Sequence, residues 1–307
     1  MNFDLRSLDI TKFLYHLSKS PQISTQSLIR QTGLPKSQLY SLLKKYSHLL
    51  SPPSRYLSIK PEFRQKILSE SQATINSIEN LDIKTIKTHL FPALSQRPSP
   101  ARDLDQFFAT KHTTLRRAKK MAKMGDIHQR HLAFLGDDDF TSIAVALTHQ
   151  AKSITVFEID DRLINIIEKI STDLSLNIEV VKQDLSKDID KIFFHTFDTV
   201  FTDPPYTPNG VSLFTNQAIN LLNPAFTSRL YLCYGNSDRA REREVVIQKI
   251  ISEFAFLIHS KYFHFNHYQG AQSIGSSSSL YLLDWTPVLK NKEVDLSKIY
   301  THQKDES

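Results

Sequence analysis

From residue 132 onward, short apolar segments alternate with amphipathic helical segments, and this alternation limits the fold more than any other feature of the chain. The predicted strands are Leu132–Leu135, Ser153–Glu158, Ile178–Val181, Asp198–Thr202 and Arg229–Cys233, followed by strands around Tyr262–His264 and Leu280–Leu283. Buried strands joined by helices are typical of a mostly parallel sheet that is covered on both faces. The sequence therefore predicts an α/β fold with a doubly wound sheet.

The residues before this alternation form a separate helical region. Ser24–Arg30 opens a helix with polar capping residues, Gly33 ends it, and a second helix begins at Pro35–Ser37. A turn at Ser51–Ser54 leads into a short strand at Arg55–Ile59. A helix, a turn, a helix and a strand in this order are typical of a winged helix.

A winged helix can bind DNA, or it can serve as a packing or dimerisation module. The second helix offers few residues for reading bases beyond Lys36, Ser37 and Gln38, which favours the packing module. A linking helix is predicted from Ile67 to about Leu90, and Gln96–Pro100 breaks the chain after it. The expected regions are a winged-helix-like domain at 1–90, a catalytic domain at 96–289 and a polar C-terminal tail at 290–307.

The composition is that of a globular protein, with 40% hydrophobic and 23% charged residues among 307. No apolar segment approaches the roughly 20 residues that cross a bilayer, and the first residues lack the pattern of a signal peptide. The single cysteine, Cys233, fits a reducing compartment, so we expect a cytoplasmic protein. No group of cysteines and histidines has the spacing of a zinc site, so no metal is expected.

The net charge of +6 taken alone suggests an anionic partner such as nucleic acid. The basic residues are scattered, however, for example at Lys36, Lys44, Lys45 and in the cluster from Arg116 to Lys120. Such a spread is usually a solvated surface. We therefore do not expect nucleic acid as a partner.

Four successive strands end in acidic residues. Gly136-Asp137-Asp138-Asp139 follows the first strand, Glu158 and Asp160 follow the second, Asp184 follows the third and Asp203 follows the fourth. A single acidic residue at such a place often caps the next helix. Four acidic strand ends in a row are harder to explain by capping, and ligands of open parallel sheets bind beyond these ends. We therefore expect an acidic ligand site.

The fourth strand runs into the rigid turn Asp203-Pro204-Pro205-Tyr206. This tetrapeptide resembles the signature with which many S-adenosylmethionine-dependent enzymes hold an amine nucleophile. The prolines limit the backbone, so the Asp203 carboxylate has a fixed direction, and Tyr206 can face a cation. The arrangement suits an amine that must lose a proton while its lone pair is aimed.

The other strand ends suit a nucleoside whose exposed end is cationic. A carboxylate after the second strand can accept both ribose hydroxyls, with Glu158 as the first candidate and Asp160 as the second. Asp184 can accept from an adenine amino group, with Leu185 beside the ring. The aspartates at 137–139 would repel a methionine carboxylate and attract an ammonium group.

The chain from about Arg97 to Trp285 resembles the branched-chain polyamine synthases, also called N4-bis(aminopropyl)spermidine synthases. The resemblance rests on the Gly136–Asp139 segment combined with the Asp203–Tyr206 turn, because the turn alone also occurs in amino-methyltransferases of nucleic acids. Further matching segments are Arg102–Phe107, Ala109–Thr110, Thr113–Arg117, Glu158–Leu163, Phe197–Thr199 and the aromatic loop Phe265–Tyr268.

The resemblance implies a Rossmann-like domain of the class I methyltransferase type, a winged-helix-like N-terminal domain and a homodimer. It implies transfer of an aminopropyl group from the co-substrate decarboxylated S-adenosylmethionine to a spermidine-like polyamine, with no permanently bound cofactor. Asp203, Asp137, Asp138 and Asp139 are then the candidate catalytic residues, and the polyamine would contact Asp203, Pro204, Pro205, Tyr206, Asp139 and Tyr268. His267 stands where an acidic residue is expected, so the acceptor amine stays open.

Two other functions fit parts of the sequence. One is an amino-methyltransferase that uses the same turn on a nucleic-acid base. The other is a regulator in which the winged helix reads DNA and the sheet binds a nucleoside. The aspartate triplet disfavours the methyltransferase, because it opposes both a methionine carboxylate and a nearby phosphate backbone.

Overall fold

The computed structural model describes residues 8–52, 55–235, 241–269 and 276–301. Internal contacts divide the chain into a smaller unit, Met1–Leu81 with Met121–Gln129, and a larger unit, Asp82–Lys120 with Arg130–Ser307. The boundary between the two units therefore lies between Leu81 and Asp82, whereas the sequence predicted a domain boundary between residues 90 and 96. The functional division into domains stays a prediction.

The smaller unit contains the predicted pair of short helices. Its elements are α1 (Leu8–Lys19), α2 (Thr25–Thr32), α3 (Lys36–Lys45), the short η1 (Ser47–Leu49) and α4 (Pro61–Glu79). The Ser24 side chain caps α2 by accepting from the Ser27 amide, and Gly33 ends α2 with a left-handed φ of 72°. The expected strand after the turn consists of two isolated antiparallel bridges, Ile23 with Leu57 and Leu50 with Ile59. The winged-helix assignment stays a prediction.

The predicted linking helix is two helices. α4 ends at Glu79, and α5 (Ile83–Leu94) begins after Asp82, whose side chain accepts from the Thr85 amide at 3.0 Å. Asp82 is a strong N-cap, so it starts a new helix instead of continuing the first one. The sequence pattern missed this break because apolar residues at helical spacing occur on both sides of it.

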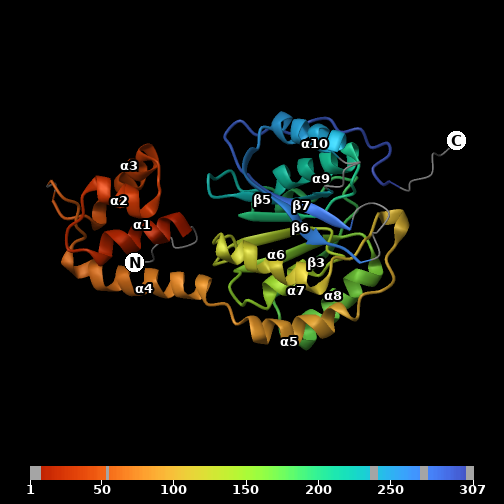
Figure 1. The fold of residues 1–307 in the computed structure, drawn as a ribbon, viewed down its shortest axis with the longest axis horizontal. Helices are drawn as coiled ribbons and strands as arrows, with labels where there is room; N and C mark the ends of the chain where they lie inside the picture. Colours follow the sequence, from red (N-terminus) through yellow and green to blue (C-terminus); the bar gives the residue numbers. More distant parts are fainter. Residues whose placement is uncertain (1–7, 53–54, 236–240, 270–275, 302–307) are drawn as a thin grey trace. The chain divides into compact units, whose positions relative to one another are not determined.

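The larger unit is built on one sheet of seven strands in the order β3-β2-β1-β4-β5-β7-β6 (Figure 1). The strands are β1 (His131–Leu135), β2 (Ser153–Glu158), β3 (Ile178–Lys182), β4 (Thr199–Thr202), β5 (Arg229–Gly235), β6 (Leu257–His267) and β7 (Ser277–Asp284). β1 to β5 pair in parallel, and β7 is antiparallel to both β5 and β6. All predicted strands of this sheet and the doubly wound Rossmann-like fold are confirmed.

The order of the strands places a switch point beside β1. The chain runs outward from β1 to β2 and β3, and then returns to build β4 on the other side of β1. Leu135 at the end of β1 pairs with Phe157 of β2 and Thr202 of β4, so the three carboxyl ends are level. Ligands of open parallel sheets bind at such a point.

Helices cover both faces of this sheet, and their apolar residues form its core. Figure 1 shows α9 (Pro208–Leu221) and α10 (Arg241–Glu253) on one face, and α7 (Thr141–Ala146) and α8 (Asp161–Asp173) on the other. The remaining elements are α6 (Lys111–Lys123) and the short η2 (Arg102–Leu104) and η3 (Lys191–Phe193). No helix among the described residues is long and apolar enough to cross a membrane.

The segment near the C-terminus packs against the larger unit, although the sequence suggested a separate polar tail. Ile299 is 5% exposed and belongs to the core. The Thr207 hydroxyl donates to the Ile299 carbonyl at 2.6 Å, and the Asn209 amide donates to the Ser297 carbonyl at 2.6 Å. A Cβ on Gly210 would lie 2.8 Å from the carbonyl oxygens of Ile299 and Pro205, so glycine permits this close approach. The segment therefore returns to the start of α9.

Candidate active site

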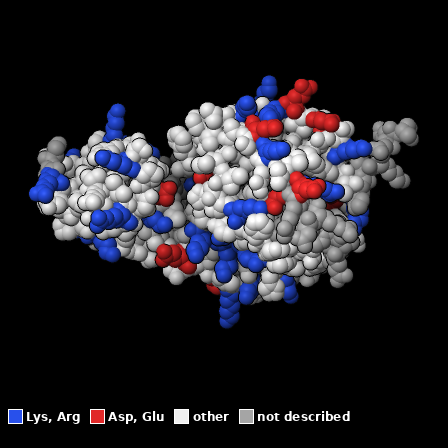
Figure 2. Space-filling view, turned by 45° about the horizontal axis from the view of Figure 1, so that its top comes forward, with Lys and Arg blue, Asp and Glu red and all other residues white. Residues whose placement is uncertain are grey.

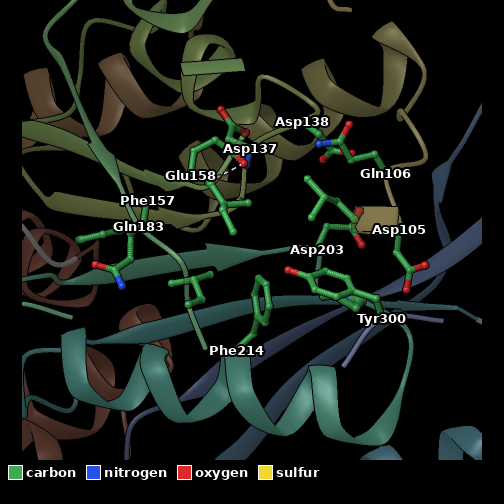
Figure 3. A pocket seen from close by; sticks show the side chains of 15 residues that line it. Asp105, Gln106, Asp137, Asp138, Phe157, Glu158, Gln183, Asp203, Phe214 and Tyr300 are labelled. Atoms are coloured by element: carbon green, nitrogen blue, oxygen red, sulfur yellow. Dashed lines mark hydrogen bonds between the residues drawn. The ribbon is translucent and has the colours of Figure 1, made fainter. Parts of the chain in front are cut away.

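A pocket opens at the carboxyl ends of the central strands, all within the larger unit (Figure 3). Its cavity volume is about 580 Å³, counted with the open mouth. The side chains and backbone that line it are Leu104, Asp105, Gln106, Gly136, Asp137, Asp138, Phe157, Glu158, Ile159, Gln183, Leu185, Asp203, Pro205, Phe214 and Tyr300. The site predicted at the strand ends is therefore a cavity with acidic and aromatic walls.

Glu158 lies at the end of β2 and is held by backbone amides. One carboxylate oxygen accepts from the amides of Ile159 at 2.8 Å and Asp160 at 3.0 Å, and the other accepts from Asp137 at 2.9 Å. Burial raises the pKa of the Glu158 carboxyl. The backbone fixes the direction of this side chain at the pocket wall, and its contact with ribose stays a prediction.

Two other acidic residues predicted to contact the nucleoside serve as local caps. Asp160 caps α8 and pairs with Arg162 at 2.6 Å, and Asp184 accepts from the amide and the hydroxyl of Ser186 at 2.9 and 2.7 Å. Neither is among the described residues that line the pocket, so the capping alternative accounts for both. Gln183 and Leu185, the neighbours of Asp184, do line the pocket.

The three aspartates after β1 point in different directions. Gly136, with a φ of 68°, turns the chain at the strand end. The Asp137 carboxylate accepts from the Thr141 amide at 2.7 Å and from the amide and hydroxyl of Ser142, at the start of α7. Burial raises the pKa of Asp137 to about 8, while these donors act in the opposite direction. Asp137 therefore forms part of the wall while its carboxylate is bound to α7.

Asp139 is turned away from the pocket and is bound to arginines. Its carboxylate lies 2.6 Å from the Arg117 guanidinium and 3.5 Å from that of Arg97, and it also accepts from the Ala109 amide. Asp139 is not among the described residues that line the pocket. The structure therefore does not bring Asp139 to the cavity in which the sequence predicted a substrate contact.

Asp138 is the member of the triplet whose carboxylate has no hydrogen-bond partner among the described residues. It lines the pocket, where burial raises its pKa well above the usual value, and the carboxylates of Asp139, Asp203 and Glu158 raise it further. A carboxyl group with free lone pairs and a raised pKa is suited to receive a proton from a bound ligand.

Asp203 lines the pocket from the end of β4 and accepts three hydrogen bonds. Its Oδ2 atom accepts from Arg117 and from the Tyr268 hydroxyl, each at 2.6 Å, and Oδ1 accepts from the Tyr206 hydroxyl at 2.9 Å. Burial raises the pKa of Asp203, and the Arg117 charge opposes that rise. These contacts fix the orientation of the carboxylate.

The residues around Asp203 differ in their relation to the pocket. Pro205 lines it, while Pro204, Tyr206 and Tyr268 are not among the described lining residues. The hydroxyls of Tyr206 and Tyr268 lie 2.8 Å apart and both bond to Asp203. The two tyrosines therefore orient a carboxylate, whereas the sequence predicted that they face the substrate.

Arg117 connects the two sides of the site, whereas its place in a basic cluster of the sequence indicated a solvated side chain. Its side chain is 0% exposed, and it pairs with Asp139 and Asp203 at 2.6 Å each and donates to Asn266 at 2.8 Å. A signal for its burial was present, because Arg117 lies four residues before the buried Met121 on α6. Acidic side chains around the pocket outnumber the arginines, and a bound cation would favour their charged forms.

No group of histidine, cysteine, aspartate or glutamate side chains within the part of the chain that the structure describes could hold a metal ion. The carboxylates of the site accept hydrogen bonds from backbone amides and hydroxyls or pair with arginine.

Residues 87–304 match the family model described as "Branched-chain polyamine synthase A C-terminal domain". An uncharacterized protein of Methanocaldococcus jannaschii is 35% identical over 209 residues, which are 67% of this chain and 51% of that protein. The N(4)-bis(aminopropyl)spermidine synthase of the same organism is 36% identical over 177 residues, 57% of this chain and 50% of that enzyme. The chain spans about half the length of the curated relatives it matches.

Among solved structures, a mutein of the branched-chain polyamine synthase from Thermus thermophilus is similar over 94% of this chain and 90% of its own, with a TM-score of 0.62 and 20% identity. That structure contains N4-aminopropylspermidine and 5'-methylthioadenosine. At this identity the likeness supports the fold, and the match of the family model supports the relationship. The chain belongs to the branched-chain polyamine synthase family.

Proposed function

We propose that this protein is an aminopropyltransferase, which moves the aminopropyl group of decarboxylated S-adenosylmethionine to an amine nitrogen of a spermidine-like polyamine. The products are a branched polyamine and 5'-methylthioadenosine. The observation that carries this proposal is the Asp138 carboxylate, which lines the pocket without a hydrogen-bond partner among the described residues, beside Asp203. The names of the family relatives, and the ligands of the Thermus thermophilus structure, agree with it.

The nucleoside part of the co-substrate fits the wall formed by β2 and β3. Glu158 would accept the ribose hydroxyls through the outer lone pairs of its carboxylate. The apolar side chains of Leu185, Phe157 and Phe214 line the same cavity and would pack against adenine, with Gln183 nearby for the polar edge of the base. This arrangement replaces Asp184, the residue first predicted to contact adenine.

The acidic wall selects the decarboxylated co-substrate. Decarboxylated S-adenosylmethionine ends in a single ammonium group, whereas S-adenosylmethionine also carries a carboxylate. Asp138 and Asp203 line the pocket close to the end of β1, where the methionine part of a nucleoside co-substrate would extend. These carboxylates would attract the ammonium group and repel a carboxylate.

The reaction needs little covalent help from the protein. The acceptor nitrogen attacks the carbon next to the sulfonium, a C–N bond forms, the C–S bond breaks, and its electron pair neutralises the sulfur. A protonated amine has a pKa near 10 and no free lone pair, so it must first lose a proton. We assign proton acceptance to Asp138, which has free lone pairs, and orientation of the amine to Asp203, which is fixed by Arg117 and two tyrosines.

The other parts of the proposal rest on the family. We propose a homodimer in the cytoplasm, with no resident cofactor, a winged-helix-like N-terminal domain and a catalytic domain that does not take nucleic acid as a substrate. Amino-methyl transfer to a nucleic-acid base remains the competing activity, and the acidic pocket argues against it because a phosphate backbone would have to lie near Asp138 and Asp203.

A direct assay separates the two activities. The protein is incubated with spermidine and with either decarboxylated S-adenosylmethionine or S-adenosylmethionine, and the products are identified by mass spectrometry. A second pair of reactions contains DNA or RNA in place of spermidine. We expect aminopropylated spermidine and methylthioadenosine only with the decarboxylated co-substrate, while a methylated nucleic acid would contradict the proposal.

A further inference from the structure

The net charge of the chain is concentrated in the smaller unit. The residues of that unit, 1–81 and 121–129, include 12 Lys and Arg against 6 Asp and Glu, a formal charge of +6 that equals the charge of the whole chain. The remaining 26 basic residues and 26 acidic residues of the larger unit cancel. The excess of basic over acidic residues therefore lies in one compact unit, although most basic residues belong to the larger one.

Within the smaller unit, the helix pair lies in a stretch without acidic residues. Between Ile10 and Pro61 the sequence contains eight Lys and Arg and no Asp or Glu. This stretch includes α1 after its first turn, all of α2 and α3, and both antiparallel bridges. Figure 2 shows many Lys and Arg side chains and few Asp or Glu on the visible face of this unit, at the left of the view.

α3 presents a polar and basic face to solvent. Leu39 and Leu42 bury the opposite side of the helix in the core of the unit. The exposed side chains are Lys36, Ser37, Gln38, Tyr40, Ser41, Lys44 and Lys45. No acidic residue among those that the structure describes forms an ion pair with Lys36 or Lys44. This set of residues is referred to below as the α3 face.

The turn before α3 and the length of α3 are compatible with a helix that enters a groove of DNA. Three residues, Gly33–Pro35, separate α2 from α3, as in helix-turn-helix units, whose turns are short and often contain glycine. α3 has 10 residues and is therefore about 15 Å long. The major groove of B-form DNA, about 12 Å wide, admits a helix of this kind, whereas the major groove of A-form RNA is too narrow for side chains to read.

We propose that the α3 face binds double-stranded DNA, mainly through phosphate contacts of Lys36, Lys44 and Lys45. Contacts with phosphate require positive charge and do not require contacts with base edges. The small number of base-reading side chains on α3 therefore does not count against this proposal. A second copy of the chain is a poorer occupant, because two such faces would repel each other. The interaction is separate from catalysis, since every residue that lines the acidic pocket lies in the larger unit.

The test measures the binding of the full chain to a fluorescent duplex of mixed sequence by anisotropy, between 50 and 300 mM salt. One variant combines Lys36→Ala, Lys44→Ala and Lys45→Ala, all exposed on α3. The matched control combines Lys152→Ala, Lys191→Ala and Lys249→Ala, which removes the same charge from exposed positions of the larger unit. Melting temperatures and aminopropyl transfer are measured for both, and neither should change.

We expect the α3 variant to bind at least about tenfold more weakly at low salt and to reduce the steepness of the log–log salt dependence by about 3, one for each lost phosphate contact. The control should stay within about twofold of the unchanged chain. Equal losses in both variants, no binding by the unchanged chain at 50 mM salt, or tighter binding to single-stranded RNA than to the duplex would each overturn the proposal. So would a change in oligomeric state of the α3 variant with unchanged DNA affinity.

Discussion

Arg117 stabilises the buried carboxylates of Asp139 and Asp203 by pairing with both of them. The replacement Arg117→Met tests this role directly. Methionine keeps an unbranched side chain but removes the charge. The guanidinium lies 2.6 Å from both Asp139 and Asp203 and is 0% exposed, so its loss leaves two buried carboxylates without their cation. Removal of one partner from a buried ion pair costs about 3–5 kcal/mol.

This cost should be visible in thermal unfolding. For a domain of 150–250 residues, about 3–5 kcal/mol corresponds to a decrease in Tm of roughly 6–20 °C, at about 2–4 °C per kcal/mol. Arg117 also lowers the pKa of Asp203 against the effect of burial, so in the variant that pKa rises further. At a pH below the pKa of Asp203 in both the unchanged protein and the variant, Asp203 is protonated in each and needs no cation. The difference in stability should therefore shrink as the pH falls and grow as it rises.

Arg116→Met provides a matched control, since it removes the same charge one residue away. Arg116 is exposed, lies 4.9 Å from the centre of the Phe265 ring and donates to the Phe265 carbonyl. The loss of one hydrogen bond and one exposed cation–π contact should cost only about 1–2 kcal/mol. If the two variants melted within about 2 °C of each other at neutral pH, the role assigned to Arg117 would be refuted.

Three further predictions concern the ligands and the reaction. Decarboxylated S-adenosylmethionine should bind more tightly than S-adenosylmethionine by roughly 1–3 kcal/mol in calorimetry, and equal affinities would exclude the acidic wall as the selective element. Glu158→Gln should weaken methylthioadenosine binding by about 1.5–3 kcal/mol, while Asp160→Asn should not; the reverse result would transfer the ribose contact to Asp160. Asp138→Asn and Asp203→Asn should each lower turnover by about 10²-fold or more with nucleoside binding retained, and near-normal turnover of a folded variant would remove that residue from the mechanism.

The sheet could be predicted from the sequence because each strand is a short apolar segment with its own boundary. The five parallel strands were found near their observed positions, and Ser153–Glu158 has the same bounds in both. The location of the site followed from the same pattern, since the carboxyl ends of parallel strands meet at one edge. These features depend on residues that are close in sequence.

The roles of individual acidic residues could not be predicted in the same way. Glu158 and Asp160 are two positions apart and chemically similar, yet one lines the pocket and the other pairs with Arg162 as a helix cap. Likewise, Gln183 and Leu185 line the pocket, whereas Asp184 between them accepts from the Ser186 amide. The direction of each side chain depends on the amides and cations that surround it, and those belong to distant segments.

The Gly-Asp-Asp-Asp segment shows how one short motif produces three different environments. Asp137 is satisfied by the first amides of α7, and Asp139 is neutralised by Arg117, which also holds Asp203. These two aspartates stabilise the turn, so the residue between them is directed into the pocket without a partner among the described residues. Asp138 is half-buried, and desolvation and its acidic neighbours raise its pKa well above the usual value, so a bound cation would stabilise its charged form. An ammonium group that binds beside Asp138 would offset this desolvation, and this is how the fold of the turn would favour the polyamine substrate that we propose.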